Sequence, residues 1–410
     1  MNTGKKVLFI TYDGMTDQLG QSQIIPYLQI LSKEGYDITL LSTEKKDKLE
    51  KEKDLIKKIL GDSGIKWEYI MFSSKPPFLS KMYDQWKLNN KVEELHKKEK
   101  FDLLHVRSYV PMGAAIKLHY RYGVPYLFDM RGFWVDERVD NGQWNLKNPV
   151  YRTLYKIYKK KEKTYLKHAE HIVTLTSKGK NELTQIFKVP AEKISVIPCC
   201  ADLDHFDYHK ISGDQKKDLK KELGINGQTK VLSYLGSLGG WYLTDEMLDF
   251  FKVFRSKVNN AVFLFITHNN KEDIIRRAEE KGIDGNTIKV KPAGRKDVPS
   301  LLSISDWSIF FIKDAYSKRA SSPTKQAEIM AMGIPVVCND IGDTGKIVNE
   351  TGAGILVQDF SEKQYEVATE LLINHKEFDK EQIRQSTFKY YDLRHAGEAY
   401  KKIYSQLIKV

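Results

Sequence analysis

The amino-acid sequence predicts an α/β protein built from two parallel-sheet domains. Short runs of β-branched and aromatic residues, such as VLFITY at 7–12, alternate with amphipathic helical segments along the chain. This order of strand, loop, helix and strand is typical of parallel sheets. The pattern stops in a polar, Lys-rich stretch at 202–222 and restarts with VLSYLGSLGG at 231–240. The length of 410 residues also favours two domains over one.

We expect the N-terminal domain to span 1–203 and the C-terminal domain 204–387. The last segment, 388–410, carries an apolar helical face that needs a partner, and we expect it to pack back on the N-terminal domain. Ligands of open parallel sheets bind in the crevice beyond the carboxyl ends of the strands. We therefore expect the functional site in a cleft where the two domains face each other.

Composition indicates an ordinary globular protein, with 41% hydrophobic and 29% charged residues. The net charge of +12 fits phosphates or an anionic membrane, although Lys-rich solvated helices have the same effect. The sequence shows no signal peptide, no apolar run long enough to span a membrane, no metal-ligand spacing and no nucleic-acid-binding motif. We expect a cytoplasmic protein that binds no nucleic acid.

The stretch SSPTKQAEIMAMGIPVV at 321–337 has the features of an anion site at the start of a helix. Pro323 suits a first turn, and Ser321, Ser322 or Thr324 can cap it. The helix N-terminus and Lys325 would then attract a phosphate, and Glu328 on the same face would accept hydrogen bonds from a ribose diol. The same spacing also fits a solvated Lys–Glu pair on a surface helix.

This stretch resembles the signature of the family 4 retaining glycosyltransferases, whose GT-B fold has two Rossmann-like domains facing across a cleft. The family pattern is two Glu separated by seven residues, followed by a run like Ala-Met-Ala-x-Gly-x-Pro-Val. Residues 328–337, EIMAMGIPVV, match its second half, but the first Glu is replaced by Ala320. The resemblance implies that Glu328 binds the nucleotide ribose. Ser321, Ser322 or nearby main chain would take over the contact of the missing Glu with the donor sugar.

The resemblance extends to the other loops that bind the donor. Ser237 in YLGSLGGW stands where the family has Arg, which makes Lys325 and Arg295 the expected partners of the phosphates. The loop NDIGDTGKIV at 339–348 resembles a Gly-rich loop that touches the donor, and DQLGQSQ at 17–23 resembles the one after the first strand. The implied donor site comprises Gly20, Ser237, Arg295, Ser322, Thr324, Lys325, Glu328, Gly342 and Thr344.

In the N-terminal half, Arg131 of LFDMRGFWVDE stands where many relatives have a His beside the reacting sugar. A guanidinium stabilises developing negative charge but cannot act as a base. We expect Arg131, Asp129 and Lys325 to be catalytic. An internal Asp129–Arg131 ion pair, a solvated loop at 136–137 and a structural His105 are the alternatives. The predicted acceptor-binding residues are His105, Trp134, Asp136 and Glu137.

The segment 151–168, YRTLYKIYKKKEKTYLKH, combines an aromatic stripe with many lysines. Such a helix can lie on anionic lipid, with each basic residue contributing about 1 kcal/mol. A core helix with a solvated Lys face has the same pattern.

The resemblance implies a metal-independent glycosyltransferase that moves a sugar from a nucleotide-sugar to an acceptor hydroxyl, without any further cofactor. We expect the acceptor to be a glycan or lipid-linked glycan of a bacterial surface polysaccharide such as capsule, O-antigen or exopolysaccharide, handled at the inner face of the membrane. A non-hydrolysing nucleotide-sugar 2-epimerase and a non-catalytic sugar-nucleotide-binding scaffold are the alternatives. A dehydrogenase would need a Gly-x-Gly-x-x-Gly turn, which GSLGGW does not supply.

Overall fold

The computed structural model describes residues 4–374 and 378–408, which fold into two compact units. The N-terminal unit comprises Met1–Pro198, Arg319–Ser321 and Leu393–Val410, and the C-terminal unit comprises Cys199–Lys318 and Ser322–Asp392. The chain thus leaves the N-terminal unit after Pro198, five residues before the boundary expected after residue 203.

The N-terminal unit is a seven-stranded, entirely parallel sheet in the order β3-β2-β1-β4-β5-β6-β7. The strands are β1 Lys6–Ile10, β2 Asp37–Glu44, β3 Lys66–Met71, β4 Leu103–Arg107, β5 Tyr126–Asp129, β6 His171–Thr174 and β7 Ile194–Val196. The helices are α1 Gln18–Gln23, α2 Ile25–Lys33, α3 Lys46–Asp62, α4 Pro77–Glu99, α5 Met112–Tyr122, α6 Trp134–Asp140, α7 Pro149–His168, α8 Ser177–Gln185, 3-10 helix η1 Ala191–Lys193 and α17 Leu393–Leu407.

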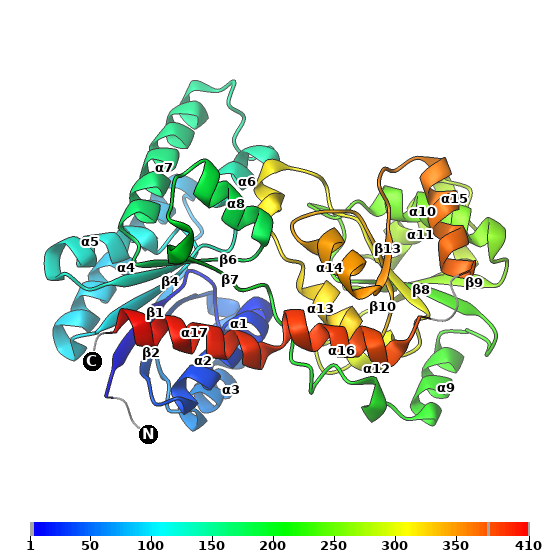
Figure 1. Cartoon of the computed structure of the whole chain (residues 1–410), viewed down its shortest axis with the longest axis horizontal. Helices are drawn as coiled ribbons and strands as arrows, with labels where there is room; N and C mark the ends of the chain where they lie inside the picture. Colours follow the sequence, from blue (N-terminus) through cyan, green and yellow to red (C-terminus); the bar gives the residue numbers. More distant parts are fainter. Residues whose placement is uncertain (1–3, 375–377, 409–410) are drawn as a thin grey trace. The chain divides into compact units, whose positions relative to one another are not determined.

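Helices cover both faces of this sheet (Figure 1). The C-terminal helix α17 lies beside α2, while α4, α5 and α7 follow one another on the opposite face. The strand order reverses between β1 and β4, which is where parallel sheets bind ligands. The loops after β1, β4 and β5 therefore form the edge at which a site is expected in this unit.

The C-terminal unit is a six-stranded parallel sheet in the order β10-β9-β8-β11-β12-β13. Its strands are β8 Lys230–Leu235, β9 Ala261–Ile266, β10 Ile288–Lys291, β11 Trp307–Phe310, β12 Val336–Cys338 and β13 Gly354–Leu356. Its helices are η2 Tyr208–Lys210, α9 Gly213–Glu222, α10 Thr244–Lys257, α11 Lys271–Glu280, η3 Gly285–Thr287, α12 Val298–Leu302, α13 Thr324–Ala331, α14 Thr344–Thr351, α15 Glu362–Asn374 and α16 Lys380–Tyr391, and η4 Tyr316–Ala320 lies where the chain passes between the units.

The central strands of both units are buried on both faces because helices cover them from either side. All six residues of β9, AVFLFI, are buried, as are all five of β4. The two parallel sheets confirm the predicted fold class. The reversal of strand order in the second unit lies between β8 and β11, and α13 follows β11 along the chain.

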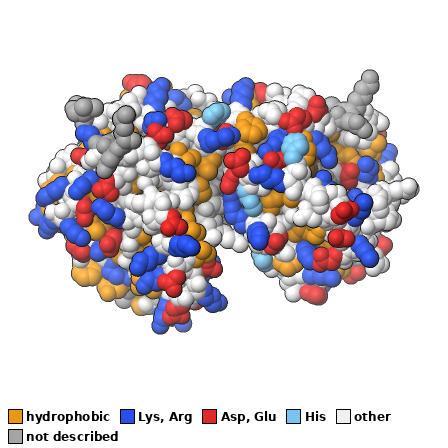
Figure 2. All heavy atoms as spheres, turned by 90° about the horizontal axis from the view of Figure 1, so that it is seen from below, with side chains coloured by type: hydrophobic (Ala, Val, Ile, Leu, Met, Phe, Trp, Pro, Cys, Tyr) orange, Lys and Arg blue, Asp and Glu red, His pale blue; other side chains and the backbone are white. Residues whose placement is uncertain are grey.

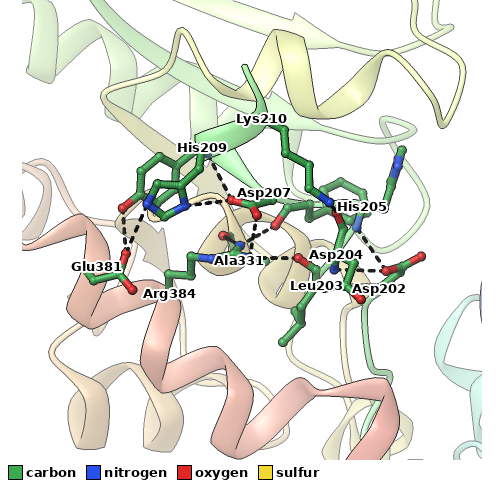
Figure 3. A network of polar contacts seen from close by, with 12 residues as sticks. Asp202, Leu203, Asp204, His205, Asp207, His209, Lys210, Ala331, Glu381 and Arg384 are labelled. Carbon is green, nitrogen blue, oxygen red and sulfur yellow. Dashed lines mark hydrogen bonds and ion pairs between the residues drawn. The ribbon is translucent and has the colours of Figure 1, made fainter. Parts of the chain in front are cut away.

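A buried arginine on α16 fastens the start of the C-terminal unit (Figure 3). The Arg384 guanidinium donates to the carbonyls of Phe206 and Ala331, both at 2.6 Å, and of Leu203 at 3.0 Å. It also lies 3.3 Å from the Asp207 carboxylate. Because Ala331 is the last residue of α13, a cation is placed at that helix's C-terminal end, where the helix dipole favours it.

Replacing Arg384 with Met is expected to lower the free energy of unfolding by about 3–5 kcal/mol, because three buried carbonyls lose their donor and Asp207 its counter-charge. Urea unfolding measures the effect. Arg276→Met is the control, since Arg276 is 60% exposed and pairs with Asp273 and Glu280 on its own helix. Equal losses in the two variants would contradict the role given to Arg384.

One face of the molecule carries mixed surface charge (Figure 2). On the face drawn in Figure 2, lysines and arginines are interspersed with acidic side chains. Within residues 4–374 and 378–408, no helix is both long and apolar enough to cross a membrane.

Candidate functional site

The C-terminal unit buries Lys325 in the first turn of α13, between two tyrosines. Its Nζ lies 3.0 Å from the Tyr234 hydroxyl and 4.2 Å and 3.4 Å from the ring centroids of Tyr234 and Tyr242. The Tyr234 hydroxyl donates in turn to the Ser237 carbonyl at 2.6 Å. Gly236, with φ +112°, leaves room for the ammonium group, since a Cβ there would lie 3.1 Å from Nζ. Burial lowers the pKa of Lys325 well below its usual value, which Glu328 partly opposes.

Glu328 lies one turn further along α13 and faces Arg295. Its Oε1 is 3.6 Å from Arg295 Nη1, and its side chain is 15% exposed. Burial raises the pKa of Glu328, which the charges of Arg295 and Lys325 oppose. The structure thus brings together three predicted donor-binding residues, two cations and one carboxylate. The excess of cations suits an anionic ligand, and the carboxylate can accept hydrogen bonds from hydroxyl groups.

The prediction that Ser321, Ser322 or Thr324 caps α13 is wrong. The N-cap is Pro323, and no side chain of the described residues caps the helix. Ser321 belongs to the N-terminal unit, and the Ser322 hydroxyl accepts from the Cys199 amide at 3.3 Å. Thr324 is the first helical residue and is half-buried. A helix start without such a cap keeps amide groups available for a ligand.

The end of α13 explains the Gly-x-Pro-Val part of the motif. Gly333 has φ +66°, and a Cβ there would lie 2.7 Å from the Lys380 carbonyl oxygen. The residue that closes the helix and turns the chain into β12 must therefore be glycine. Ala320, which replaces the family's first Glu, is fully buried in the N-terminal unit.

The other predicted donor residues lie at neighbouring loops of the C-terminal unit. Ser237 follows β8 and is exposed. Gly342 is buried in the loop after β12, with φ +58°. The Thr344 hydroxyl donates to the Asn339 carbonyl at 2.8 Å and accepts from the Ile341 amide at 2.9 Å, so it shapes this loop.

The N-terminal unit holds a buried charge cluster around Asp129, at the end of β5. Arg107 Nη1 lies 3.5 Å and His105 Nε2 3.7 Å from Asp129 Oδ2, and Arg131 Nη1 lies 3.7 Å from Oδ1. The Tyr400 hydroxyl of α17 donates to Oδ2 at 3.3 Å. Burial opposes ionisation of Asp129, but Arg131, His105 and Arg107 outweigh it and lower its pKa to about 2.

Arg131 has φ +59° and Ser108, after the neighbouring strand β4, has φ +66°. Left-handed backbone at residues other than glycine is uncommon and often accompanies functional sites. Both residues lie at the carboxyl edge of the sheet, and Asp129 holds the Arg131 guanidinium there. The structure therefore contains the predicted Asp129–Arg131 ion pair, in a position that also suits a site residue.

His105 is buried within β4 and does not reach the surface. Its Nδ1 lies 2.7 Å from the Tyr404 hydroxyl of α17, and burial lowers its pKa despite the opposing effect of Asp129. A buried, neutral imidazole that contacts the C-terminal helix fits the structural alternative for His105.

The remaining predicted acceptor residues belong to α6. Both Asp136 oxygens have partners, the Tyr155 hydroxyl and Lys159 Nζ, each at 2.8 Å. The Trp134 ring stacks on Tyr109, with ring centroids 6.1 Å apart, and the Arg138 guanidinium lies 4.7 Å from its centroid. Glu137 is half-buried. Asp136 thus braces α6 against α7, and the alternative of a solvated loop is wrong for this residue.

Gly20 is required by its own loop. A Cβ at this position would lie 2.3 Å from the Gly14 carbonyl oxygen. The same loop is fixed by the buried Glu44 at the end of β2, which accepts hydrogen bonds from the Met15 amide at 2.7 Å, the Thr16 hydroxyl at 2.7 Å and the Ser42 hydroxyl at 2.6 Å. Packing accounts for Gly20 without a bound donor.

The helix predicted at 151–168 is α7, and one of its lysines points inward. Lys159 binds Asp136 and the buried Glu162, so it does not belong to the exposed basic face. Lysines and Arg152 still dominate the exposed face, together with Ile157 and Val150. Both alternatives for this segment remain compatible with its burial pattern.

Asp129 is expected to make stability depend on pH in the acid range. The pKa of Asp129 is about 2 in the folded protein and 3.8 in the unfolded chain. The contribution of its carboxylate to folding stability is therefore complete above pH 3.8 and is lost as the pH falls to about 2. The loss amounts to about 2 kcal/mol. Asp129→Asn should flatten this part of the curve in urea unfolding at a series of pH values. The control Asp214→Asn changes a carboxylate that is 89% exposed and should leave the dependence of stability on pH unchanged. If stability fell as steeply with pH in Asp129→Asn as in the wild type, the expectation would be refuted.

In the part of the chain that the structure describes, no three or more His, Cys, Asp and Glu side chains are grouped so as to hold a metal ion.

The C-terminal unit thus holds one candidate cluster, Lys325, Glu328 and Arg295, and the N-terminal unit holds the charge cluster around Asp129. Solved structures share the fold of this chain over nearly its full length. A glycosyltransferase from Rickettsia africae ESF-5 is 15% identical with a TM-score of 0.72, covering 99% of both chains. Anabaena Alr3699/HepE in complex with UDP-glucose is 13% identical with a TM-score of 0.68, covering 98% of this chain and 99% of that one. WaaG, a glycosyltransferase involved in lipopolysaccharide biosynthesis, is 14% identical with a TM-score of 0.65, covering 97% and 99%. The fold is GT-B.

Two family models match the sequence in succession. Residues 28–205 match Glycosyltransferase Family 4, and residues 215–387 match Glycosyl transferases group 1. The chain is a glycosyltransferase, with a first part of the family 4 type and a second part of the group 1 type. No curated protein matches the sequence significantly.

Proposed function

We propose that the chain is a retaining glycosyltransferase that moves a sugar from a nucleotide-sugar donor to an acceptor hydroxyl. The observation that carries the proposal is the cluster of Lys325, Glu328 and Arg295 at the start of α13. Lys325 and Glu328 lie one turn apart on α13, and Arg295 reaches Glu328 from the loop after β10, so the cluster offers cations for a diphosphate and a carboxylate for a ribose diol. The likeness to a protein solved with UDP-glucose supports a donor of this chemical class.

Each residue of the cluster has a distinct role in the proposal. Glu328 accepts hydrogen bonds from the ribose hydroxyls, and Arg295 keeps its carboxylate ionised. A bound diphosphate raises the pKa of Lys325, because the phosphate charge offsets the burial that disfavours the ammonium form. The two cations and the start of α13 then stabilise the departing diphosphate, so the proposal requires neither a divalent metal nor another cofactor.

In the N-terminal unit we assign Arg131 to the stabilisation of oxygens on the reacting sugar and Asp129 to holding the guanidinium. Of the predicted acceptor residues, His105 and Asp136 are buried and bonded to side chains of their own unit. Trp134 and Glu137 remain the candidates for acceptor contacts.

We further propose a glycan or lipid-linked acceptor in the synthesis of a bacterial surface polysaccharide, at the cytoplasmic face of the membrane. The likeness to a glycosyltransferase involved in lipopolysaccharide biosynthesis supports this class of acceptor. The exposed lysines of α7 supply charge that anionic lipid attracts.

A thermal-shift screen against UDP-, GDP-, ADP- and CMP-sugars tests the proposal, because a ligand of the native state raises the melting temperature. One nucleotide class should raise it, and Glu328→Ala should abolish the shift. Incubation with that donor and glycan acceptors should then release the nucleotide and form a new glycosidic bond. Binding without turnover would favour a scaffold, and conversion of the donor sugar without an acceptor would favour an epimerase.

A further inference from the structure

Helix α4 presents three large apolar side chains to solvent within its second and third turns. Met82, Tyr83 and Trp86 are 59%, 54% and 58% exposed. The rings of Tyr83 and Trp86 stack at an interplanar angle of 15°, with centroids 5.7 Å apart. Single exposed apolar residues are ordinary, but a contiguous group on one helix face indicates a contact surface. We call these three residues the α4 patch.

The opposite face of α4 packs against the unit, so the α4 patch is exposed on a helix that is held in place. Leu88, Val92 and Leu95 are buried. The buried Asp84 accepts from the Tyr12 hydroxyl at 2.7 Å and the Ser73 amide at 3.1 Å and pairs with Lys87 at 2.9 Å. These bonds tie the start of α4 to the loops after β1 and β3, at the carboxyl edge of the sheet.

Two of the four lysines between residues 72 and 92 are paired with acids. Lys87 pairs with Asp84, and Lys91 pairs with Glu68 and Glu94. The other two, Lys75 and Lys81, are exposed, and Lys81 directly precedes Met82 in α4. Lys81 Nζ lies 4.4 Å from the Phe72 ring centroid. Trp and Tyr rings with nearby lysines are the side chains that settle at the level of lipid head groups, where the rings are half apolar and half wet.

We propose that the α4 patch, together with Lys75 and Lys81, inserts into the head-group region of an anionic phospholipid membrane. The apolar group and its basic surroundings complement the acyl boundary and the negative lipid surface respectively. The inference deepens the membrane contact proposed above and stands on other residues than those of α7. Helices α4 and α7 both contact α5, on the same face of the sheet. A membrane held by α4 would meet the unit at the edge that carries Asp129 and Arg131, where a lipid-linked acceptor is needed.

Co-sedimentation of the full chain with phosphatidylcholine vesicles, with and without phosphatidylglycerol, tests the inference. The triple variant Met82→Ser, Tyr83→Ser and Trp86→Ser should weaken binding to the anionic vesicles by about tenfold or more, since three half-exposed apolar side chains no longer enter the lipid. Leu55→Ser is the matched control, because Leu55 on α3 is 52% exposed. Melting temperature and nucleotide binding should stay unchanged in both variants.

Fluorescence of Trp86 gives a second, local measurement. Vesicles should shift the emission of the wild type to shorter wavelength, and Trp86→Phe, which keeps an apolar ring, should remove that shift while retaining most of the binding. The inference would be overturned if the triple variant bound anionic vesicles like the wild type. Loss of vesicle binding on replacing Lys156, Lys160 and Lys163 by Gln would then support the α7 contact instead. Absence of vesicle binding by the wild type would overturn both contacts but not the transferase reaction. Binding of the α4 patch to soluble glycans in place of vesicles would also overturn it.

Discussion

Replacing Lys325 with Met is expected to strengthen the unliganded protein while weakening donor binding. The free energy of unfolding should rise by about 1–2 kcal/mol, because a buried ammonium group in an apolar setting is replaced by a thioether that packs well on tyrosine rings. Affinity for the diphosphate of the donor should fall about 100-fold, because one charge-assisted partner is lost. A gain in stability together with a loss in ligand affinity is expected when a residue serves binding at the expense of stability.

The sign of the pH dependence gives an independent check. The folded protein holds the Lys325 proton less tightly than the unfolded chain, since burial lowers the pKa of Lys325. Wild-type stability should therefore rise with pH through the interval between the two pKa values, and Lys325→Met should lack that rise. Urea unfolding and calorimetric titration with the nucleotide found in the screen measure the two effects. The control Lys363→Met changes an exposed residue of α15 and should alter neither. A stability loss in Lys325→Met would show that the lysine is structural.

Replacing Glu328 with Gln is expected to reduce donor affinity about 100-fold while the fold is retained. Gln has nearly the same shape, but it offers one neutral acceptor in place of a carboxylate that can accept from both ribose hydroxyls. The loss should be as large for the free nucleoside diphosphate as for the nucleotide-sugar, because the ribose is common to both. Calorimetric titration of both ligands measures it.

The matched control for this variant is Glu366→Gln, an exposed position on α15 in the same unit. It should bind both ligands like the wild type. If Glu328→Gln lost affinity for the nucleotide-sugar alone, Glu328 would contact the sugar and the ribose assignment would be wrong.

The order of elements was predictable because parallel strands covered on both faces leave a strong apolar signal. β8, β9 and β4 are buried nearly throughout, and the helices between them are amphipathic. The packing of the last segment was harder to place, because α16 and α17 belong to different units although they are separated by a single residue, Asp392. Such a change of unit within a helical stretch depends on tertiary contacts and leaves no local pattern.

Lys325 and Glu328 could be named as candidates from the motif at 321–337, because its resemblance to the family signature favoured a donor site over a solvated Lys–Glu pair. The residues that surround these charged side chains could not be predicted from the sequence. Tyr234 and Tyr242 enclose Lys325 from β8 and its following loop, and Tyr400 and Tyr404 reach Asp129 and His105 from the other end of the chain. The sequence showed the two C-terminal tyrosines only as part of an apolar face. Neither acceptor binding nor a solvated loop anticipated the bonds of Asp136 to Tyr155 and Lys159, because these two partners come from the next helix.

The most direct test of the proposed donor site is a crystal structure of the chain with the nucleotide identified in the screen. We expect the ribose hydroxyls within hydrogen-bond distance of the Glu328 carboxylate and the diphosphate at Lys325 Nζ, the Arg295 guanidinium and the first amides of α13. A nucleotide whose ribose and phosphates lie away from α13 would contradict the account.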